Sequence, residues 1–111
     1  MAGWDYIVGE TGYDRPFNFW DKGTNLGFNG TGVSTVTMTI LKSDLTAVTP
    51  TAISNVALTV TQVNPLKASL AVVAATPNVP QVPASYIVQF TITIGAEIRK
   101  TFELDLRVYN G

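Results

Sequence analysis

The chain of 111 residues contains no cysteine and no histidine. Without cysteine it forms no disulfide, and without histidine it lacks both the usual general base near neutral pH and the usual zinc ligand. Hydrolytic chemistry would have to use paired carboxylates or a Ser–Lys arrangement. We therefore expect no enzymatic activity, no cofactor and no bound metal.

Charge is also scarce. Only 14% of the residues are charged, and seven basic against eight acidic side chains give a net charge of −1 with no basic run. Nucleic-acid binding needs a clustered positive footprint, and membrane-surface binding needs a basic amphipathic helix, so we expect neither. The longest apolar run, Leu70 to Ala75, is too short to span a bilayer. Met1 to Asp5 has no features of a secretory signal, which predicts synthesis in a cytoplasm without export.

The last third of the chain has the pattern of a long β-hairpin. Apolar residues occupy every second position on either side of a turn at Gly95-Ala96, with polar residues between them. Because successive side chains of a strand point to opposite faces, this period of two predicts one buried and one solvated face. The apolar positions are Tyr86, Val88, Phe90, Ile92 and Ile94, then Ile98, Phe102, Leu104, Leu106 and Val108.

Shorter segments of the same kind precede the hairpin. Strands are predicted over residues 4–8, 17–20, 33–41, 56–61 and 70–74. Parity within the second segment favours Phe17 and Phe19 over Trp20 as core residues, and the continuous apolar run at 70–74 predicts little solvent on either face. About seven short strands without a helix predict an all-β, immunoglobulin-like antiparallel β-sandwich, formed as one domain by residues 1–111.

Few side chains are candidates for chemistry. Glu103 and Asp105 alternate with basic residues on the solvated face of the last strand, which is typical of a charged surface, although a glycosidase-type carboxylate pair is an alternative. Asp21 to Asn25 weakly resembles a calcium loop, but it lacks acidic density and a closing glutamate. A plain turn is the better interpretation.

Aromatic residues and a proline-containing loop are the candidates for binding a partner. Aromatic side chains are enriched at interface cores, and a rigid loop with two overlapping Pro-x-x-Pro patterns can act as a docking ledge. The predicted contact residues are Trp4, Tyr6, Tyr13, Trp20, Pro77, Val79, Pro80 and Tyr109. Packing in the core is the alternative for each aromatic ring, and a rigid solvent-exposed connector is the alternative for the loop.

Taken in order, several turn and strand motifs resemble one known family. They are Gly9–Gly12 after the first strand, Phe17–Gly23, Leu26–Met38 and Pro83–Phe90, followed by Ile92–Gly95 and a last strand through Val108. This order resembles the immunoglobulin-like N-terminal domain of phage baseplate upper proteins. Glu10 stands where that family usually has Asp, and Ser85 stands where Gly is common before the tyrosine.

The resemblance implies a non-enzymatic virion protein that docks onto other virion proteins, as a capsid decoration or as a tail or baseplate adaptor. It implies a location in the virion and many copies, and it leaves homo-oligomers open. In the family a long region follows this module, whereas the present chain ends at Gly111, so we expect a free-standing protein. The alternative is a carbohydrate-binding β-sandwich that adheres to a host surface through exposed aromatic rings.

Overall fold

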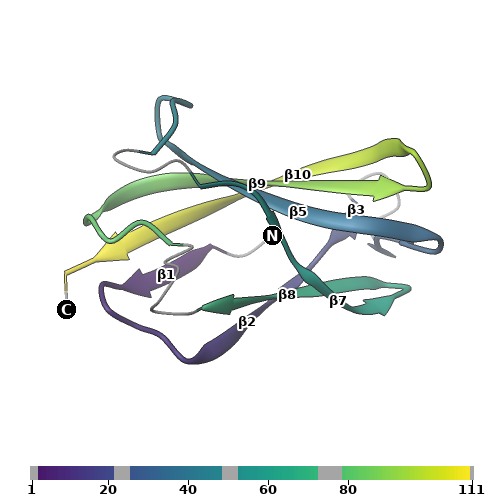
Figure 1. The fold of residues 1–111 in the computed structure, drawn as a ribbon, viewed down its shortest axis with the longest axis horizontal. Coiled ribbons are helices and arrows are strands. Elements are labelled where there is room, and N and C mark those ends of the chain that lie inside the picture. The colour runs from purple at the N-terminus through teal and green to yellow at the C-terminus, as the bar shows by residue number, and fades with distance from the viewer. Residues whose placement is uncertain (1–2, 22–25, 49–52, 73–78, 111) are drawn as a thin grey trace.

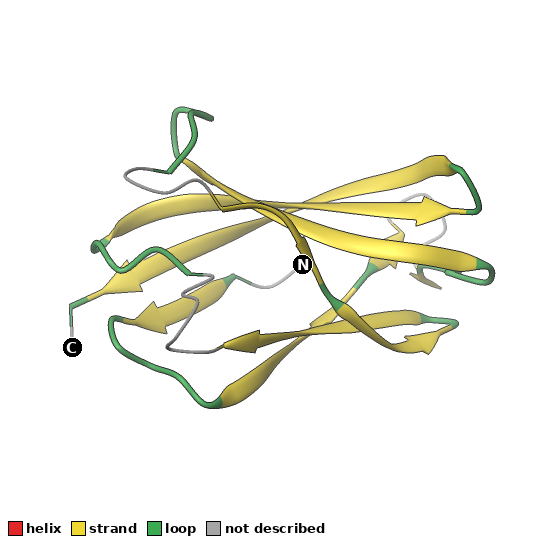
Figure 2. Cartoon of the chain, viewed as in Figure 1, coloured by secondary structure: helices red, strands yellow, loops and turns green. Residues whose placement is uncertain are grey.

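A computed structural model describes residues 3–21, 26–48, 53–72 and 79–110 of the chain (Figure 1). These residues form strands and connecting loops only, as Figure 2 shows. None of them forms a helix that is long and apolar enough to cross a membrane. The strands are β1 (Trp4–Ile7), β2 (Tyr13–Asn18), β3 (Trp20–Asp21), β4 (Leu26–Gly27), β5 (Val33–Lys42), β6 (Ile53–Ala57), β7 (Thr59–Val63), β8 (Leu66–Val72), β9 (Ala84–Ile94) and β10 (Glu97–Tyr109).

The strands form a sandwich of two layers. One sheet has the order β1-β10-β9-β5-β6, and the facing sheet has the order β2-β8-β7. All neighbours are antiparallel except β1, which runs parallel to β10. The short pair β3–β4 closes one end of the sandwich. The all-β, immunoglobulin-like sandwich predicted from the sequence is confirmed, with a higher strand count because β3 and β4 are very short and the chain divides at Leu58 into β6 and β7.

The long hairpin is confirmed, and it supplies the centre of the core. Val88, Phe90 and Ile92 on β9 are fully buried, and the outward positions between them are not. The ring of Phe90 lies 4.8 Å from that of Phe17 on β2 and 5.3 Å from that of Phe19. Since β2 and β9 belong to different sheets, these aromatic contacts join the two layers.

The prediction for residues 70–74 needs correction. Strand β8 begins at Leu66, and its buried residues alternate with residues that reach solvent, including the exposed Ala71. Alternation arises because β8 lies between β2 and β7 in a sheet with only one face against the core. The expected continuous burial is therefore wrong up to Val72, and residues 73–74 lie outside the described part of the chain.

A hydrogen bond at the start of β9 is characteristic of immunoglobulin-like sandwiches. The Tyr86 hydroxyl donates to the Val82 carbonyl oxygen at 2.7 Å, four residues upstream. A tyrosine at the start of the penultimate strand that bonds back to its own loop is known as a tyrosine corner. This hydrogen bond fixes the loop of residues 79–83 against the beginning of β9.

Candidate docking surface

Trp4 and Tyr6, predicted as partner contacts, lie in the core. Only 3% of Trp4 and 1% of Tyr6 is exposed. The cause is the parallel pairing of β1 with β10, which places Trp4 beside Leu106 and Tyr6 beside Val108 on the inner face of the sheet. The two aromatic rings pack on each other 6.2 Å apart, so neither offers a surface to a partner.

The proline-containing loop also differs from the prediction. Val79 and Pro80 are buried, because the loop turns inward before β9 begins. Pro77 lies outside the described residues. Val79 and Pro80 are therefore not accessible to a partner. In the described part of this loop, only residues after Pro80 could contact one.

Three exposed apolar residues lie on neighbouring segments of backbone at one corner of the five-stranded sheet, and we call Ile7, Val82 and Tyr109 the apolar corner. Their exposed fractions are 47%, 61% and 44%. Ile7 is the direct ladder partner of Tyr109, and the pairing of Ala84 with Val108 brings the end of the 79–83 loop to the same place. Figure 1 shows the ends of β1 and β10 and this loop at one end of the molecule.

A hydrogen-bond network holds the backbone beneath the apolar corner. The Gln81 side-chain amide donates to the Tyr6 hydroxyl at 3.0 Å and to the Val79 carbonyl at 3.0 Å, and its oxygen accepts from the Gly9 amide at 3.0 Å. The Tyr6 hydroxyl donates to the Glu10 carbonyl oxygen at 2.7 Å. Two loops that are distant in sequence are thus joined through one glutamine, so the corner is presented by a fixed backbone.

Sequence reasoning found only Tyr109 of the three residues in the apolar corner. Ile7 has the opposite parity to Trp4 and Tyr6, so it could have been identified once those two were assigned to the core. Val82 stands between a glutamine and a proline in a loop, where no periodic pattern indicates its direction. Its exposure follows from the inward turn at Val79 and Pro80 and from the bond that Tyr86 makes to its carbonyl.

The other exposed aromatic residue lies at the opposite end of the sandwich. Trp20 on β3 is 49% exposed, in agreement with the parity argument, and it pairs with Gly27 on β4. A side chain added at Gly27 would meet Pro65 in the turn after β7, so this end is closely packed. Trp20 is therefore separated from the apolar corner, and the two do not form one surface (Figure 1).

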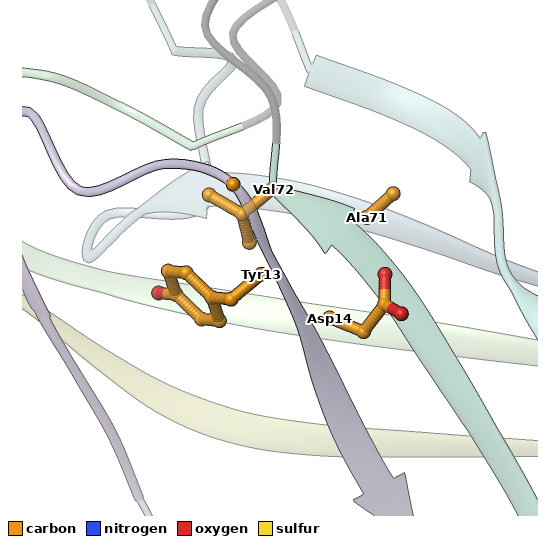
Figure 3. A pocket seen from close by; sticks show the side chains of 5 residues that line it. Tyr13, Asp14, Ala71 and Val72 are labelled. Carbon is orange, nitrogen blue, oxygen red and sulfur yellow. The ribbon is translucent and has the colours of Figure 1, made fainter.

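Tyr13, the remaining predicted contact, lines a small hollow between β2 and β8 (Figure 3). Gly12, Asp14, Ala71 and Val72 complete the lining, and the volume is about 150 Å³. Pockets that hold small-molecule ligands usually exceed about 300 Å³. Burial raises the pKa of the Tyr13 phenol, with Glu10 as a smaller cause. The hollow is too small for a ligand site and belongs to the packing of β2 against β8.

Glu103 and Asp105, considered as a carboxylate pair, lie on the same strand. Glu103 and Asp105 are exposed on β10, and Glu103 accepts a hydrogen bond from the Gln89 amide at 3.1 Å. No three potential ligand residues of the described segments come together to hold a metal ion. The turn at Asp21 to Asn25, considered as a calcium loop, falls largely outside those segments.

Comparison of the chain with protein-family models, with curated proteins and with solved structures gave no match.

Proposed function

We propose that this chain is a non-enzymatic structural protein of a phage virion, which docks onto other virion proteins through the apolar corner. The observation that supports docking is the grouping of Ile7, Val82 and Tyr109 on hydrogen-bonded backbone at one end of the sandwich. Single exposed apolar residues are common on protein surfaces, but three at one corner resemble the centre of a binding site.

Rigidity strengthens this interpretation. A partner that binds must pay for every group that it orders, and a surface that is already fixed lowers that cost. The Gln81 side chain and the Tyr86 hydroxyl hold the 79–83 loop from both sides, so Val82 needs little further ordering on binding. Tyrosine and branched aliphatic side chains then supply contact area with few rotamers.

The assignment to a phage virion does not rest on the apolar corner. It rests on the order of sequence motifs, which resembles that of the immunoglobulin-like domain of phage baseplate upper proteins. The immunoglobulin-like sandwich is the fold which that resemblance implies, and the tyrosine corner falls within the Pro83–Phe90 motif. The alternatives of capsid decoration and of tail or baseplate adaptor share the same docking chemistry.

The test is reconstitution on particles. Phage particles assembled without the protein would be mixed with the purified chain, and the bound fraction would be measured after sedimentation. We expect saturable binding of the wild type and at least about tenfold weaker binding of the double variant Ile7→Ser/Val82→Ser. Val63→Ser is the control, since Val63 is exposed at the end of β7 in the facing sheet, and its carbonyl accepts from the Gly30 amide near the start of β5, at the other end of the sandwich.

Two results would contradict the proposal. One is the absence of the chain from purified wild-type particles by mass spectrometry. The other is equal binding by the wild type and the double variant, which would remove the apolar corner from the docking surface. Specific glycan binding that depends on Trp20 would instead favour the carbohydrate-binding alternative.

A further inference from the structure

The Arg15 side chain lies on aromatic rings at the side of the sandwich where β1 and β2 are the edge strands. On β2 it has the same parity as Tyr13 and Phe17, so it points toward the opposite sheet and is half-buried. Its guanidinium carbon lies 4.8 Å from the centre of the Phe17 ring and 5.8 Å from that of the Trp4 ring. A guanidinium favours such a position, because it is weakly hydrated and is attracted to the faces of aromatic rings.

Within the described segments, no carboxylate forms an ion pair with this cation. Asp14, the next residue along the strand, lies on the opposite side of β2 from Tyr13 (Figure 3). The Glu10 carboxylate accepts a hydrogen bond from the Ile7 amide at 2.7 Å. The ionisable group that acts on Arg15 is the Tyr13 phenol, which is neutral near neutral pH because burial raises its pKa further above 10.0. Arg15 is thus partly desolvated without an anionic partner, and its own pKa is lowered by that burial.

The other described basic side chains have a different environment. Arg107 faces Asp5 directly across the ladder between β10 and β1. Lys42 lies close enough to Asp44 to lower the pKa of that carboxyl, after the larger effect of hydrogen bonds from Thr46. Lys67 is exposed on β8. Partial burial and the lack of an acidic neighbour therefore coincide at Arg15 among these residues.

The hydrogen-bond donors of Arg15 are also largely unused. A guanidinium carries several N–H donors in one plane, and Arg15 donates from Nη1 to the Pro16 carbonyl. Its remaining donors have no protein acceptor in the described part of the chain. Donors on one side of the guanidinium form the fork that binds a carboxylate through parallel bonds. We propose that Arg15 binds a carboxylate, supplied by an aspartate or glutamate side chain of the virion protein on which this chain docks.

The source of the carboxylate rests on the proposed function and on the position of Arg15. The guanidinium contacts Trp4, and Ile7 of the apolar corner is three residues further along β1, about 10 Å along the backbone. An interface of ordinary size, about 800 Å² on each partner, covers both positions. The partner would then combine an apolar contact at the corner with an acidic side chain that complements the charge of Arg15.

Titration with acetate, the simplest carboxylate probe, tests the site without any virion protein. The Nε–Hε signal of Arg15 would be followed by NMR in the isotope-labelled chain, while sodium acetate replaces sodium chloride at constant ionic strength. Half-saturation should need an acetate concentration at least about fivefold lower than for free N-acetyl-arginine amide, because the half-buried guanidinium is less hydrated. The signal is assigned from its absence in Arg15→Lys.

Sedimentation with phage particles tests the source of the carboxylate. Arg15→Gln should bind at least about tenfold more weakly than the wild type. Arg15→Lys should recover only part of this loss, since lysine keeps the charge without the planar fork. Lys67→Gln is the matched control, because it removes the same charge from an exposed side chain on β8, and it should bind like the wild type. Circular dichroism checks that each variant is folded, and Arg15→Lys replaces Arg15→Gln if the latter is not.

Three outcomes would overturn the inference. They are half-saturation at Arg15 no lower than for the free arginine derivative, equal particle binding by the wild type and Arg15→Gln, and an equal loss in Arg15→Gln and Lys67→Gln. Failure of the proposed docking is distinguishable, because it appears as a wild type that does not bind particles at all. In that case the acetate titration, which involves no particle, still decides whether Arg15 is a carboxylate site.

Discussion

Replacing Tyr86 with Phe removes one hydroxyl and tests the tyrosine corner directly. The hydroxyl donates to the Val82 carbonyl at 2.7 Å, and only 6% of the tyrosine is exposed. Loss of one such bond in a largely buried setting costs about 1 kcal/mol of unfolding free energy. For 111 residues the unfolding entropy is about 0.23 kcal/mol/K, so the midpoint of thermal unfolding should fall by about 4 °C.

Thermal unfolding followed by circular dichroism measures this shift, with Tyr109→Phe as the matched control. Tyr109 is 44% exposed, and its replacement should change the midpoint by less than about 1 °C. Because the lost bond anchors the 79–83 loop, amide hydrogen exchange in that loop should also accelerate. Equal midpoints for Tyr86→Phe and the wild type would show that the corner bond does not stabilise this fold.

Three further predictions concern stability. Burial raises the pKa of Tyr13 and Tyr86 above their ordinary value of 10.0, so the folded chain keeps these protons at a higher pH than the unfolded chain does. The contribution of these two phenols to the free energy of unfolding is complete below a pH of about 10 and is lost as the pH rises through the folded-state pKa. The midpoint of thermal unfolding should therefore fall above a pH of about 10, and it should fall less steeply in Tyr86→Phe. Phe90→Ala removes a fully buried ring that contacts both sheets and should cost about 3–5 kcal/mol in urea unfolding; a loss below about 1.5 kcal/mol would contradict the packing. A Cβ at Gly30 would lie 2.8 Å from the Val63 carbonyl oxygen, so Gly30→Ala should cost about 1–3 kcal/mol, whereas Gly3→Ala, at 3.5 Å from its nearest neighbour, should be neutral in the same assay.

Local alternation predicted the central strands well. Val36, Met38 and Ile40 are buried as their parity requires, and so are the inward positions of β9 from Tyr86 to Ile92. In a sandwich each strand of this kind has one face toward the core, so a period of two carries nearly all the information about burial. The same reasoning correctly assigned Phe17 and Phe19 to the core and Trp20 to the surface.

The predictions for the candidate docking surface depended on contacts that no local pattern contains. Trp4 and Tyr6 were named as partner contacts because aromatic side chains are enriched at interfaces. Their strand pairs with β10, which lies about a hundred residues away in sequence and sets which face of β1 is buried. Likewise, Val79 and Pro80 turn inward because Gln81 bonds to Gly9 and Tyr6 across the end of the sandwich. Both errors arise where segments distant in sequence determine the direction of a side chain.

The parallel arrangement of β1 and β10 has a mechanical consequence. The ladder from Trp4–Leu106 to Ile7–Tyr109 joins the first and last strands with the same direction. A pull that draws the beginning and the end of the chain apart therefore slides one strand along the other, and it strains all the bonds of this ladder together instead of opening them one at a time. Rupture under such shear needs a greater force than unzipping does, because several bonds must break together.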